Sequence, residues 1–418
     1  MVVRKVIIAK RPATLHGIVE LPASKSLSNR ALAMGLLPEY GLENIARCED
    51  TRVMADAIAK MPDRVDVGAA GTAMRFLTAK FCTVSGKRLI TGSDRMKKRP
   101  IGPLVEALRK LGANVEYAEE EGFPPLCITG GLLHGGEVEI PANVSSQYVS
   151  ALLMVAPRMK NGMTLKLVGK IISRPYIEMT LGLMKMLGAD AEWTDGQTIR
   201  VEPGEYRHVT YRIENDWTAS SYWYEMMALC EDKDAEIFLP GLTENSLQGD
   251  SILPRLFAPL GVQTTYTQEG VRLTKSTVTA SRMDEDLTST PDLAQTLVVT
   301  CVCLGIPFHF TGLESLKIKE TDRMNALRIE MSKLGVTLVE EDGCALRWER
   351  PAHWRLNPQE GATMATYQDH RMAMSMAPIC LKLGSIQIEH PEVVEKSYPL
   401  FWDNMQKMGF DLMRKEIL

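Results

Sequence analysis

The chain has 418 residues, of which 45% are hydrophobic and 24% charged, and 48 Lys and Arg against 52 Asp and Glu give a net charge of −4. This composition is ordinary for a globular protein of two or three domains, and it excludes disorder, collagen and coiled coil as the main architecture. The charge balance gives no global basic field for nucleic acid, although it is compatible with a local basic cleft.

Cysteine and histidine usage argues against disulfides and metal sites. The eight cysteines form no C-x-x-C pair, and the seven histidines show no paired ligand spacing. We therefore expect reduced cysteines in a cytoplasmic protein without a metal. The N-terminus is too short and charged for a signal peptide, and the longest apolar stretch, residues 297–310, is too short for a membrane helix, so we expect no membrane partner.

The first predicted helix starts at Ser26 and is apolar nearly all round after a polar first turn. A helix that is apolar on every side is buried. An outer helix follows over residues 52–58 and ends at Met61-Pro62. The strands expected after it are mostly absent, so this unit is clearly shorter than those that follow.

Five longer units follow in chain order. Their buried helices are predicted to start, at nearly equal intervals along the chain, at Thr72, Ser146, Ser220, Asp292 and Asp369. Their outer helices end, at intervals that are also nearly equal, at Gly112, Gly188, Gly261, Gly335 and Gly409. Two signals with the same period indicate an internal repeat, and glycine suits the left-handed position after a helix, where the chain reverses into a strand. Six units of two helices and several strands predict a mixed α/β fold, with three units per domain and sheets packed on buried helices.

Basic residues gather at the predicted helix starts, where they are electrostatically misplaced. A helix N-terminus carries a partial positive charge, so each cation there costs about 0.3–1 kcal/mol. The simplest reason for this pattern is one or more bound polyanions shared by several helix ends. Three acids recur among these cations and could transfer protons, namely Asp292, Glu320 and Asp369. The chain has no P-loop, no G-x-G-x-x-G and no G-x-S-x-G motif.

Seven motifs resemble those of the 3-phosphoshikimate 1-carboxyvinyltransferase (EPSP synthase) family of enolpyruvyl transferases. They are SKSLSNRAL at 24–32, GAAGTAMR at 68–75, RMKKRPI at 95–101, SSQ at 145–147, KETDR at 319–323, DHRMA at 369–373 and KSYP at 396–399. The motifs occur in the expected order, and the resemblance covers nearly the whole chain.

The resemblance implies a two-domain inside-out α/β barrel with three two-helix, four-strand repeats per domain and a truncated first repeat. One domain would comprise residues 24–214, on the shikimate 3-phosphate side. Residues 1–23 and 215–418 would form the other, on the phosphoenolpyruvate side, with the active site in the cleft between them.

The implied reaction transfers the enolpyruvyl group of phosphoenolpyruvate to the 5-hydroxyl of shikimate 3-phosphate and releases phosphate, by addition and elimination. It belongs to chorismate and aromatic amino acid biosynthesis. The resemblance implies no cofactor and no metal, only small-molecule partners, and a monomer in the cytoplasm.

The resemblance also implies the site residues. Shikimate 3-phosphate would contact Lys25, Ser26, Arg30, Ser145, Ser146, Gln147, Ser173, Asp292 and Lys319. Phosphoenolpyruvate would contact Lys25, Gly71, Arg99, Gln147, Arg323, Arg371 and Lys396. Arg75 and Tyr176 would be further cleft residues. Asp292 would accept the 5-hydroxyl proton, and Glu320 and Lys25 are candidates for protonating the methylene carbon or the leaving phosphate.

Four positions depart from the family pattern: Ala69 stands for Asn, Phe76 for Pro, Asn215 for Gly and Trp217 for Ala. Two alternatives follow. A UDP-N-acetylglucosamine enolpyruvyl transferase would share the fold and phosphoenolpyruvate, but such an enzyme carries a reactive Cys in an Arg-rich Gly loop, and no Cys here lies in one. A non-catalytic anion-binding paralogue is suggested by the truncated repeat and Ala69.

Overall fold

In the computed structural model, which describes residues 4–357 and 362–417, the chain divides into two compact units. One is Ala23–Ile213, and the other combines Met1–Pro22 with Glu214–Leu418. Among the described residues, no helix is long and apolar enough to cross a membrane.

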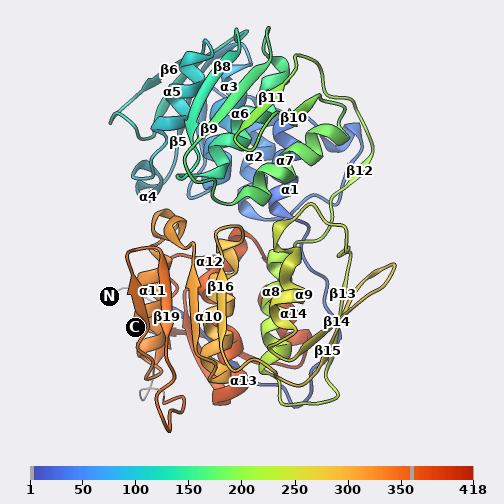
Figure 1. Cartoon of the computed structure of the whole chain (residues 1–418), viewed down its shortest axis with the longest axis vertical. Helices are drawn as coiled ribbons and strands as arrows, with labels where there is room; N and C mark the ends of the chain where they lie inside the picture. The colour runs from blue at the N-terminus through green and yellow to red at the C-terminus, as the bar shows by residue number, and fades with distance from the viewer. Residues whose placement is uncertain (1–3, 358–361, 418) are drawn as a thin grey trace. The chain divides into compact units, whose positions relative to one another are not determined.

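The unit of residues 23–213 is built from buried helices surrounded by sheets and outer helices (Figure 1, blue to green). The buried helices are α1 (Lys25–Met34), α3 (Gly71–Cys82) and α6 (Ser146–Val155). The outer helices are α2 (Glu49–Lys60), α4 (Asp94–Lys97), α5 (Gly102–Lys110) and α7 (Arg174–Met186). Short 3-10 turns lie at Pro38–Tyr40 and Ala156–Arg158.

Two of the sheets in this unit have four strands in the same arrangement. One has the order β4 (Arg64–Asp66), β5 (Gly86–Thr91), β7 (Leu126–Gly130), β6 (Asn114–Tyr117). The other has the order β8 (Gly136–Pro141), β9 (Met163–Val168), β11 (Thr198–Val201), β10 (Ala191–Trp193). In each sheet, a parallel pair of strands adjoins an antiparallel hairpin. In the second sheet, for example, Met163 of β9 pairs with Gly136 of the parallel strand β8 and with Val201 of the antiparallel strand β11.

The third sheet of this unit has only two strands, β3 (Leu42–Glu43) and β12 (Tyr211–Arg212), paired in parallel. These correspond to the parallel pairs of the other two sheets, and the antiparallel hairpin is missing. The truncated first repeat is thus confirmed, and the missing part is the hairpin after α2.

In the unit that contains residues 214–418, the described residues form three four-stranded sheets (Figure 1, yellow to red). Its helices are α8 (Trp217–Leu229), α9 (Leu253–Phe257), α10 (Ala294–Leu304), α11 (Arg323–Ser332), α12 (His370–Met376), α13 (Cys380–Leu383) and α14 (Phe401–Lys407). Short 3-10 turns lie at Gly249–Ile252, Pro291–Leu293, Glu314–Ile318, Ala377–Ile379 and Pro391–Lys396.

The N-terminal segment completes two of these sheets. The first has the order β20 (Thr363–Met364), β21 (Ser385–Glu389), β1 (Arg4–Lys10), β22 (Asp411–Ile417). The second has the order β14 (Val262–Tyr266), β15 (Gly270–Lys275), β13 (Glu236–Pro240), β2 (His16–Ile18). The third has the order β16 (Met283–Asp286), β17 (Phe308–Thr311), β19 (Ala345–Trp348), β18 (Val339–Glu341).

The mixed α/β fold predicted from the repeats is confirmed, with two adjustments. The sheets of each unit are separate, so hydrogen bonding among the described residues does not close them into a barrel. The helix expected to start at Ser220 begins at Trp217, because the Asp216 side chain caps it by accepting from the Ala219 N–H at 3.0 Å. Asp292 lies in a 3-10 turn, and α10 starts after it at Ala294.

Candidate active site

The predicted acids and bases of the unit with residues 214–418 form one cluster around Arg323. This side chain is 2% exposed, and its Nε donates to Asp369 Oδ2 at 2.7 Å. Its Nη1 donates to Asp292 Oδ1 at 2.8 Å, and its Nη2 donates to Glu320 Oε2 at 2.9 Å. One buried guanidinium therefore holds three carboxylates that come from three different helix starts.

Two further cations complete this cluster. Arg371 Nη2 donates to Asp292 Oδ2 at 3.0 Å, and Lys319 Nζ lies 3.6 Å from Asp292 Oδ1. Asp292 thus has Arg323 and Lys319 at one oxygen and Arg371 at the other. The three cations match the three carboxylates in number.

Local structure explains how these side chains are positioned. Arg323 is the first residue of α11, which Asp322 caps by accepting from the Asn325 N–H at 3.0 Å. Asp369 caps α12 by accepting from the Arg371 N–H at 2.9 Å, and its carboxylate is fully buried. Asp369 therefore bonds both a helix start and Arg323, which offsets the cost of placing basic residues at helix N-termini.

The cluster perturbs the ionisation of its cations. Burial alone would lower the pKa of Arg323, but Asp369, followed by Glu320 and Asp292, raises this pKa above its ordinary value. Burial lowers the pKa of Lys319, and Asp292 partly opposes that effect. Perturbed ionisation in one cluster of opposite charges is typical of functional sites.

Asp250, which the sequence analysis missed, lies beside this cluster. Burial is the main cause that raises its pKa to about 7; the nearby Asp292 adds to the rise, while Thr218 and Arg371 oppose it. The Thr218 hydroxyl donates to its carboxylate. The acid lies in the 3-10 turn Gly249–Ile252, where an acidic residue is ordinary and gives no sequence signal.

Lys396 bonds a backbone carbonyl rather than a carboxylate of the Arg323 cluster. Its Nζ donates to the Gln368 carbonyl at 2.6 Å, so it bonds the segment that precedes Asp369.

In the unit of residues 23–213, Lys25 is paired with an acid that the sequence analysis did not identify. Its Nζ lies 3.1 Å from Asp50 Oδ2 on α2. The pair is mostly buried and joins the start of α1 to the start of α2.

Arg30 joins three helices of this unit through its guanidinium. It donates to the Ser26 carbonyl at 3.0 Å, to Thr180 Oγ1 at 2.8 Å, and through one Nη2 to Ser150 Oγ and the Tyr176 carbonyl at 3.2 Å. Burial is the main cause that lowers its pKa, to about 10. These bonds use four of the five N–H donors, so Arg30 fixes α1, α6 and α7 relative to one another.

Gly71 and Arg99 are in direct contact. A Cβ on Gly71 would lie 2.6 Å from Arg99 Nη1, so only glycine allows the guanidinium to approach the start of α3 this closely. Arg75 donates to the Gly71 carbonyl at 3.1 Å and to the Pro100 carbonyl at 3.2 Å. Arg75 therefore supports the Gly71–Arg99 contact.

The serine motif at the start of α6 contacts the start of α3. Ser145 caps α6 by accepting from the Gln147 N–H at 3.3 Å, and Gln147 Nε2 donates to Thr72 Oγ1 at 3.2 Å. Ser146 is buried in the first turn, and Ser173 is a buried residue with φ of 53° just before α7. The predicted residues of this unit thus gather at four helix starts.

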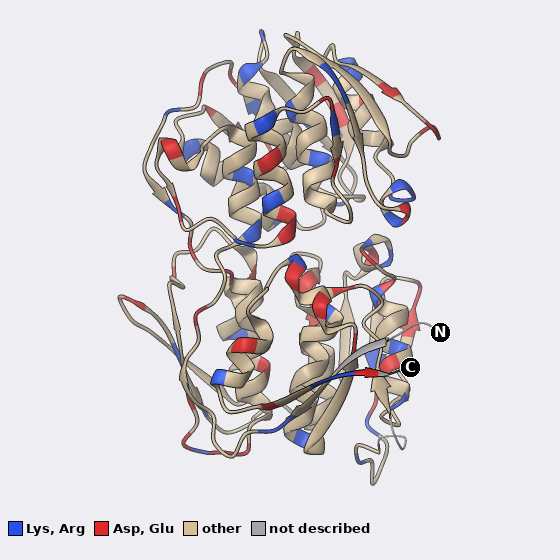
Figure 2. Cartoon of the chain, turned by 180° about the vertical axis from the view of Figure 1, so that it is seen from behind, with Lys and Arg blue, Asp and Glu red and all other residues tan. Residues whose placement is uncertain are grey.

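Another charge network, in which Arg282 and Arg347 pair with Asp284, Glu341 and Glu349, differs from the Arg323 cluster in being largely exposed. Lys and Arg are interspersed with Asp and Glu over both units (Figure 2). Over residues 4–357 and 362–417, no group of three or more His, Cys, Asp and Glu is placed to hold a metal ion.

Known proteins are similar to this chain in sequence and in fold. Residues 58–405 match the family model described as EPSP synthase (3-phosphoshikimate 1-carboxyvinyltransferase). A 3-phosphoshikimate 1-carboxyvinyltransferase of Bacteroides fragilis is 50% identical over 403 residues, which cover 96% of this chain and 97% of the relative. One of Yersinia pseudotuberculosis is 32% identical over 427 aligned positions, covering 95% and 97%.

Two solved structures share the fold at low sequence identity. EPSP synthase from Acinetobacter baumannii superposes with a TM-score of 0.76 at 19% identity and covers 99% of this chain and 100% of that one. The enolpyruvyl transferase NikO from Streptomyces tendae gives 0.73 at 15% identity and covers all of both chains. These matches confirm the resemblance found in the motifs, and the chain belongs to the EPSP synthase (3-phosphoshikimate 1-carboxyvinyltransferase) family.

Proposed function

We propose that the helix-start residues of both units carry out the reaction of this family: transfer of the enolpyruvyl group of phosphoenolpyruvate to the 5-hydroxyl of shikimate 3-phosphate. The observation that carries the proposal is the Asp292 carboxylate held by Arg323, Arg371 and Lys319. A base held among cations that can bind the anionic groups of both substrates supports this reaction.

In the addition step, Asp292 accepts the proton of the 5-hydroxyl while that oxygen bonds to C2 of phosphoenolpyruvate. Carbon C3 takes up a proton from Glu320 or Lys25, which gives a tetrahedral intermediate. In the elimination step, C3 loses a proton, the C2–C3 double bond forms again and the C2–O bond to phosphate breaks. The cations stabilise the charge on the carboxylate and the leaving phosphate, so positioning and electrostatics supply most of the catalysis.

The resting cluster also supports an exchange of partners on binding. Arg323 and Arg371 both bond Asp292, and Arg323 also bonds Glu320. We propose that the anionic groups of phosphoenolpyruvate compete for these guanidinium donors and free the two carboxylates for proton transfer. The residues predicted for the other unit, Lys25, Gly71, Arg99 and Gln147, would supply the remaining contacts.

The test is phosphate release. The protein is mixed with phosphoenolpyruvate and shikimate 3-phosphate, and in parallel with phosphoenolpyruvate and UDP-N-acetylglucosamine. Release with the first pair alone supports the proposal, and release with the second alone supports the other transferase. Substrate binding without release in either mixture would support the non-catalytic paralogue.

We also propose that the enzyme acts as a monomer in the cytoplasm and without a metal or cofactor. All eight cysteines are free thiols, which suits a reducing compartment. Light scattering at working concentration tests whether the mass in solution is that of a monomer, 46.5 kDa. Activity that survives dialysis against EDTA would show that the reaction needs no metal that EDTA can remove.

A further inference from the structure

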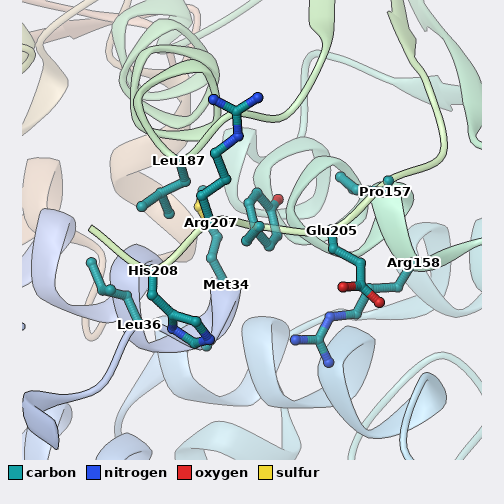
Figure 3. A pocket seen from close by; sticks show the side chains of 11 residues that line it. Met34, Leu36, Pro157, Arg158, Leu187, Glu205, Arg207 and His208 are labelled. Atoms are coloured by element: carbon teal, nitrogen blue, oxygen red, sulfur yellow. The ribbon is translucent and has the colours of Figure 1, made fainter. Parts of the chain in front are cut away.

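A pocket of about 580 Å³ lies in the unit of residues 23–213 (Figure 3), and none of its lining residues belongs to the candidate active site. This volume is in the range of small-molecule sites. The lining comes from four parts of the chain: residues 34–36, residues 157–158, Leu187 and residues 204–208.

The pocket lies at the C-terminal ends of α1, α6 and α7. Met34 is the last residue of α1, while Pro157 and Leu187 follow α6 and α7. Arg30 bonds residues of the same three helices that lie before these ends, so the three helices all point toward the pocket. A ten-residue helix is about 15 Å long, which is the distance that separates the pocket from Lys25 and Ser26.

The backbone beside this space is joined by fewer hydrogen bonds than at the equivalent position in the next repeats. At the corresponding junction between the second and third repeats, the Lys160 N–H donates to the Leu133 carbonyl and the Asn161 N–H to the His134 carbonyl. Leu133 is buried there. At the pocket, no backbone hydrogen bond among the described residues joins 34–40 to 204–208. The two segments meet at the rings of Tyr40 and His208, whose centroids are 4.5 Å apart, and the pocket lies between residues 34–36 and 204–208.

Two cations meet at the wall of the pocket near Gly35. Arg158 Nη2 lies 3.3 Å, and Lys80 Nζ 3.7 Å, from the position that a Cβ on Gly35 would take. Lys80 is 4% exposed, and its Nζ donates to the Ala33 carbonyl at 3.0 Å. Arg158 takes part in no hydrogen bond or ion pair with any residue that the structure describes.

The surrounding charges do not fully compensate these cations. The C-terminal helix ends carry partial negative charge and favour cations. Burial, and then the neighbouring Arg158, nevertheless lower the pKa of Lys80 to about 7. Glu205 also lines the pocket, but it forms no ion pair with Arg158. Arg207 points away from Arg158 (Figure 3), and its side chain lies against Gly188 beyond α7.

The rest of the lining is suited to an apolar group. Met34, Leu36 and Leu187 contribute aliphatic side chains. Tyr206 contributes its ring, with its hydroxyl already donated to the Met154 carbonyl at 2.9 Å. A ligand that fits this lining has an apolar body and an anionic group at one end.

We propose that this pocket binds a small organic anion, with its carboxylate at Arg158 next to Lys80 and its apolar body against Met34, Leu36 and Leu187. The pocket is separate from the candidate active site, so the proposal does not depend on the proposed function.

The test uses benzoate as the probe and benzamide as its neutral counterpart. The full chain is labelled with ¹³C in the methionine methyl groups, and the Met34 signal is assigned with Met34→Leu. Met34 reports on the pocket, while Met96, which contacts Arg75, reports on the phosphoenolpyruvate side of the candidate active site. Benzoate should shift the Met34 signal in a saturable way, and benzamide should bind more weakly by about tenfold or more.

Two variants locate the charge that matters. Arg158→Gln removes an exposed side chain and should weaken benzoate at Met34 by about tenfold or more. Arg200→Gln, on the exposed face of β11, is the matched control and should bind as the unaltered chain does. The proposal is overturned if Met34 does not move, if only Met96 moves, if benzamide binds equally well, or if Arg158→Gln has no effect.

Discussion

The proposed role of Asp292 as the base can be tested directly by substitution. Asp292→Asn keeps the size of the side chain but removes its charge and most of its basicity, and its amide nitrogen can no longer accept from the cation that it faces. We expect kcat for phosphate release to fall by about a hundred- to ten-thousand-fold, because a positioned base contributes an effect of this size. Substrate binding should stay measurable by calorimetry.

The control for Asp292 is Asp403→Asn, an exposed change on α14 in the same unit. It should leave kcat unchanged. Full activity of Asp292→Asn would show that Asp292 is not the base. The next candidate would be the nearby Asp250, because burial raises its pKa to about 7.

Glu225 predicts a pH-dependent stability. It is fully buried on α8, and its carboxyl oxygens have no hydrogen-bond partner among the described residues. Burial raises its pKa well above the ordinary value. The folded state therefore holds this proton to a higher pH than the unfolded state, so its contribution to the free energy of unfolding falls as pH rises above the ordinary value, by up to about 1.4 kcal/mol per pH unit.

Urea unfolding at pH 5 and pH 8 checks this sign. Relative to the unaltered chain, Glu225→Gln should gain stability between the two pH values, whereas Glu269→Gln, at an exposed position, should not. Parallel stability changes in all three proteins would contradict a protonated Glu225.

The sequence could predict the types of the site residues but not all of their partners. Basic residues at helix starts stand out because they oppose the helix dipole, and this signal found Arg323, Arg371 and Lys25. Asp50 and Asp250 carry no such signal, since an acid near a helix start is ordinary. Their importance lies in contacts that link segments far apart in the chain, such as Lys25 with Asp50.

At the scale of elements, the two-stranded sheet depends on a close contact at Gly41. Gly41 has φ of 96°, and a Cβ there would lie 3.0 Å from the Thr210 Cα. The Gly41 carbonyl also accepts from the Tyr211 N–H at 2.9 Å, next to the β3–β12 pair. We expect Gly41→Ala to lower the free energy of unfolding by about 1–3 kcal/mol in urea titrations.

Gly169→Ala is the matched control for this contact. Gly169 also has a positive φ, of 88°, but a Cβ there would meet nothing within 4 Å. It should show only the backbone strain, so Gly41→Ala should be the more destabilised variant. Equal losses would mean that contact with Thr210 adds nothing to the strain.

The repeated elements were predictable because each repeat carries local signals. Glycines after the outer helices adopt positive φ, as at Gly112, Gly188 and Gly335. The missing hairpin was visible only as a length difference, and the sequence did not show that β12 would pair with β3, with Tyr211 opposite the distant Leu42. Such long-range pairing depends on packing of the whole unit, which local patterns do not encode.

At the scale of the whole molecule, the chain passes between its two units only at residues 22–23 and 213–214. The residues predicted for shikimate 3-phosphate come from both units, with Ser26 and Ser145 in one and Lys319 and Asp292 in the other. A ligand bound by both sets favours the arrangement in which both reach it, and therefore shifts the population toward that arrangement.

We therefore expect shikimate 3-phosphate to reduce the radius of gyration measured by small-angle scattering. Inorganic phosphate at the same concentration is the control, because it offers a single anionic group and cannot engage both sets. The Asp292→Asn variant should still show a smaller radius with shikimate 3-phosphate if the contraction reflects binding, because Arg323, Arg371 and Lys319 remain. An unchanged radius with saturating shikimate 3-phosphate would show that binding does not draw the two sets together, even where phosphate release proves the reaction.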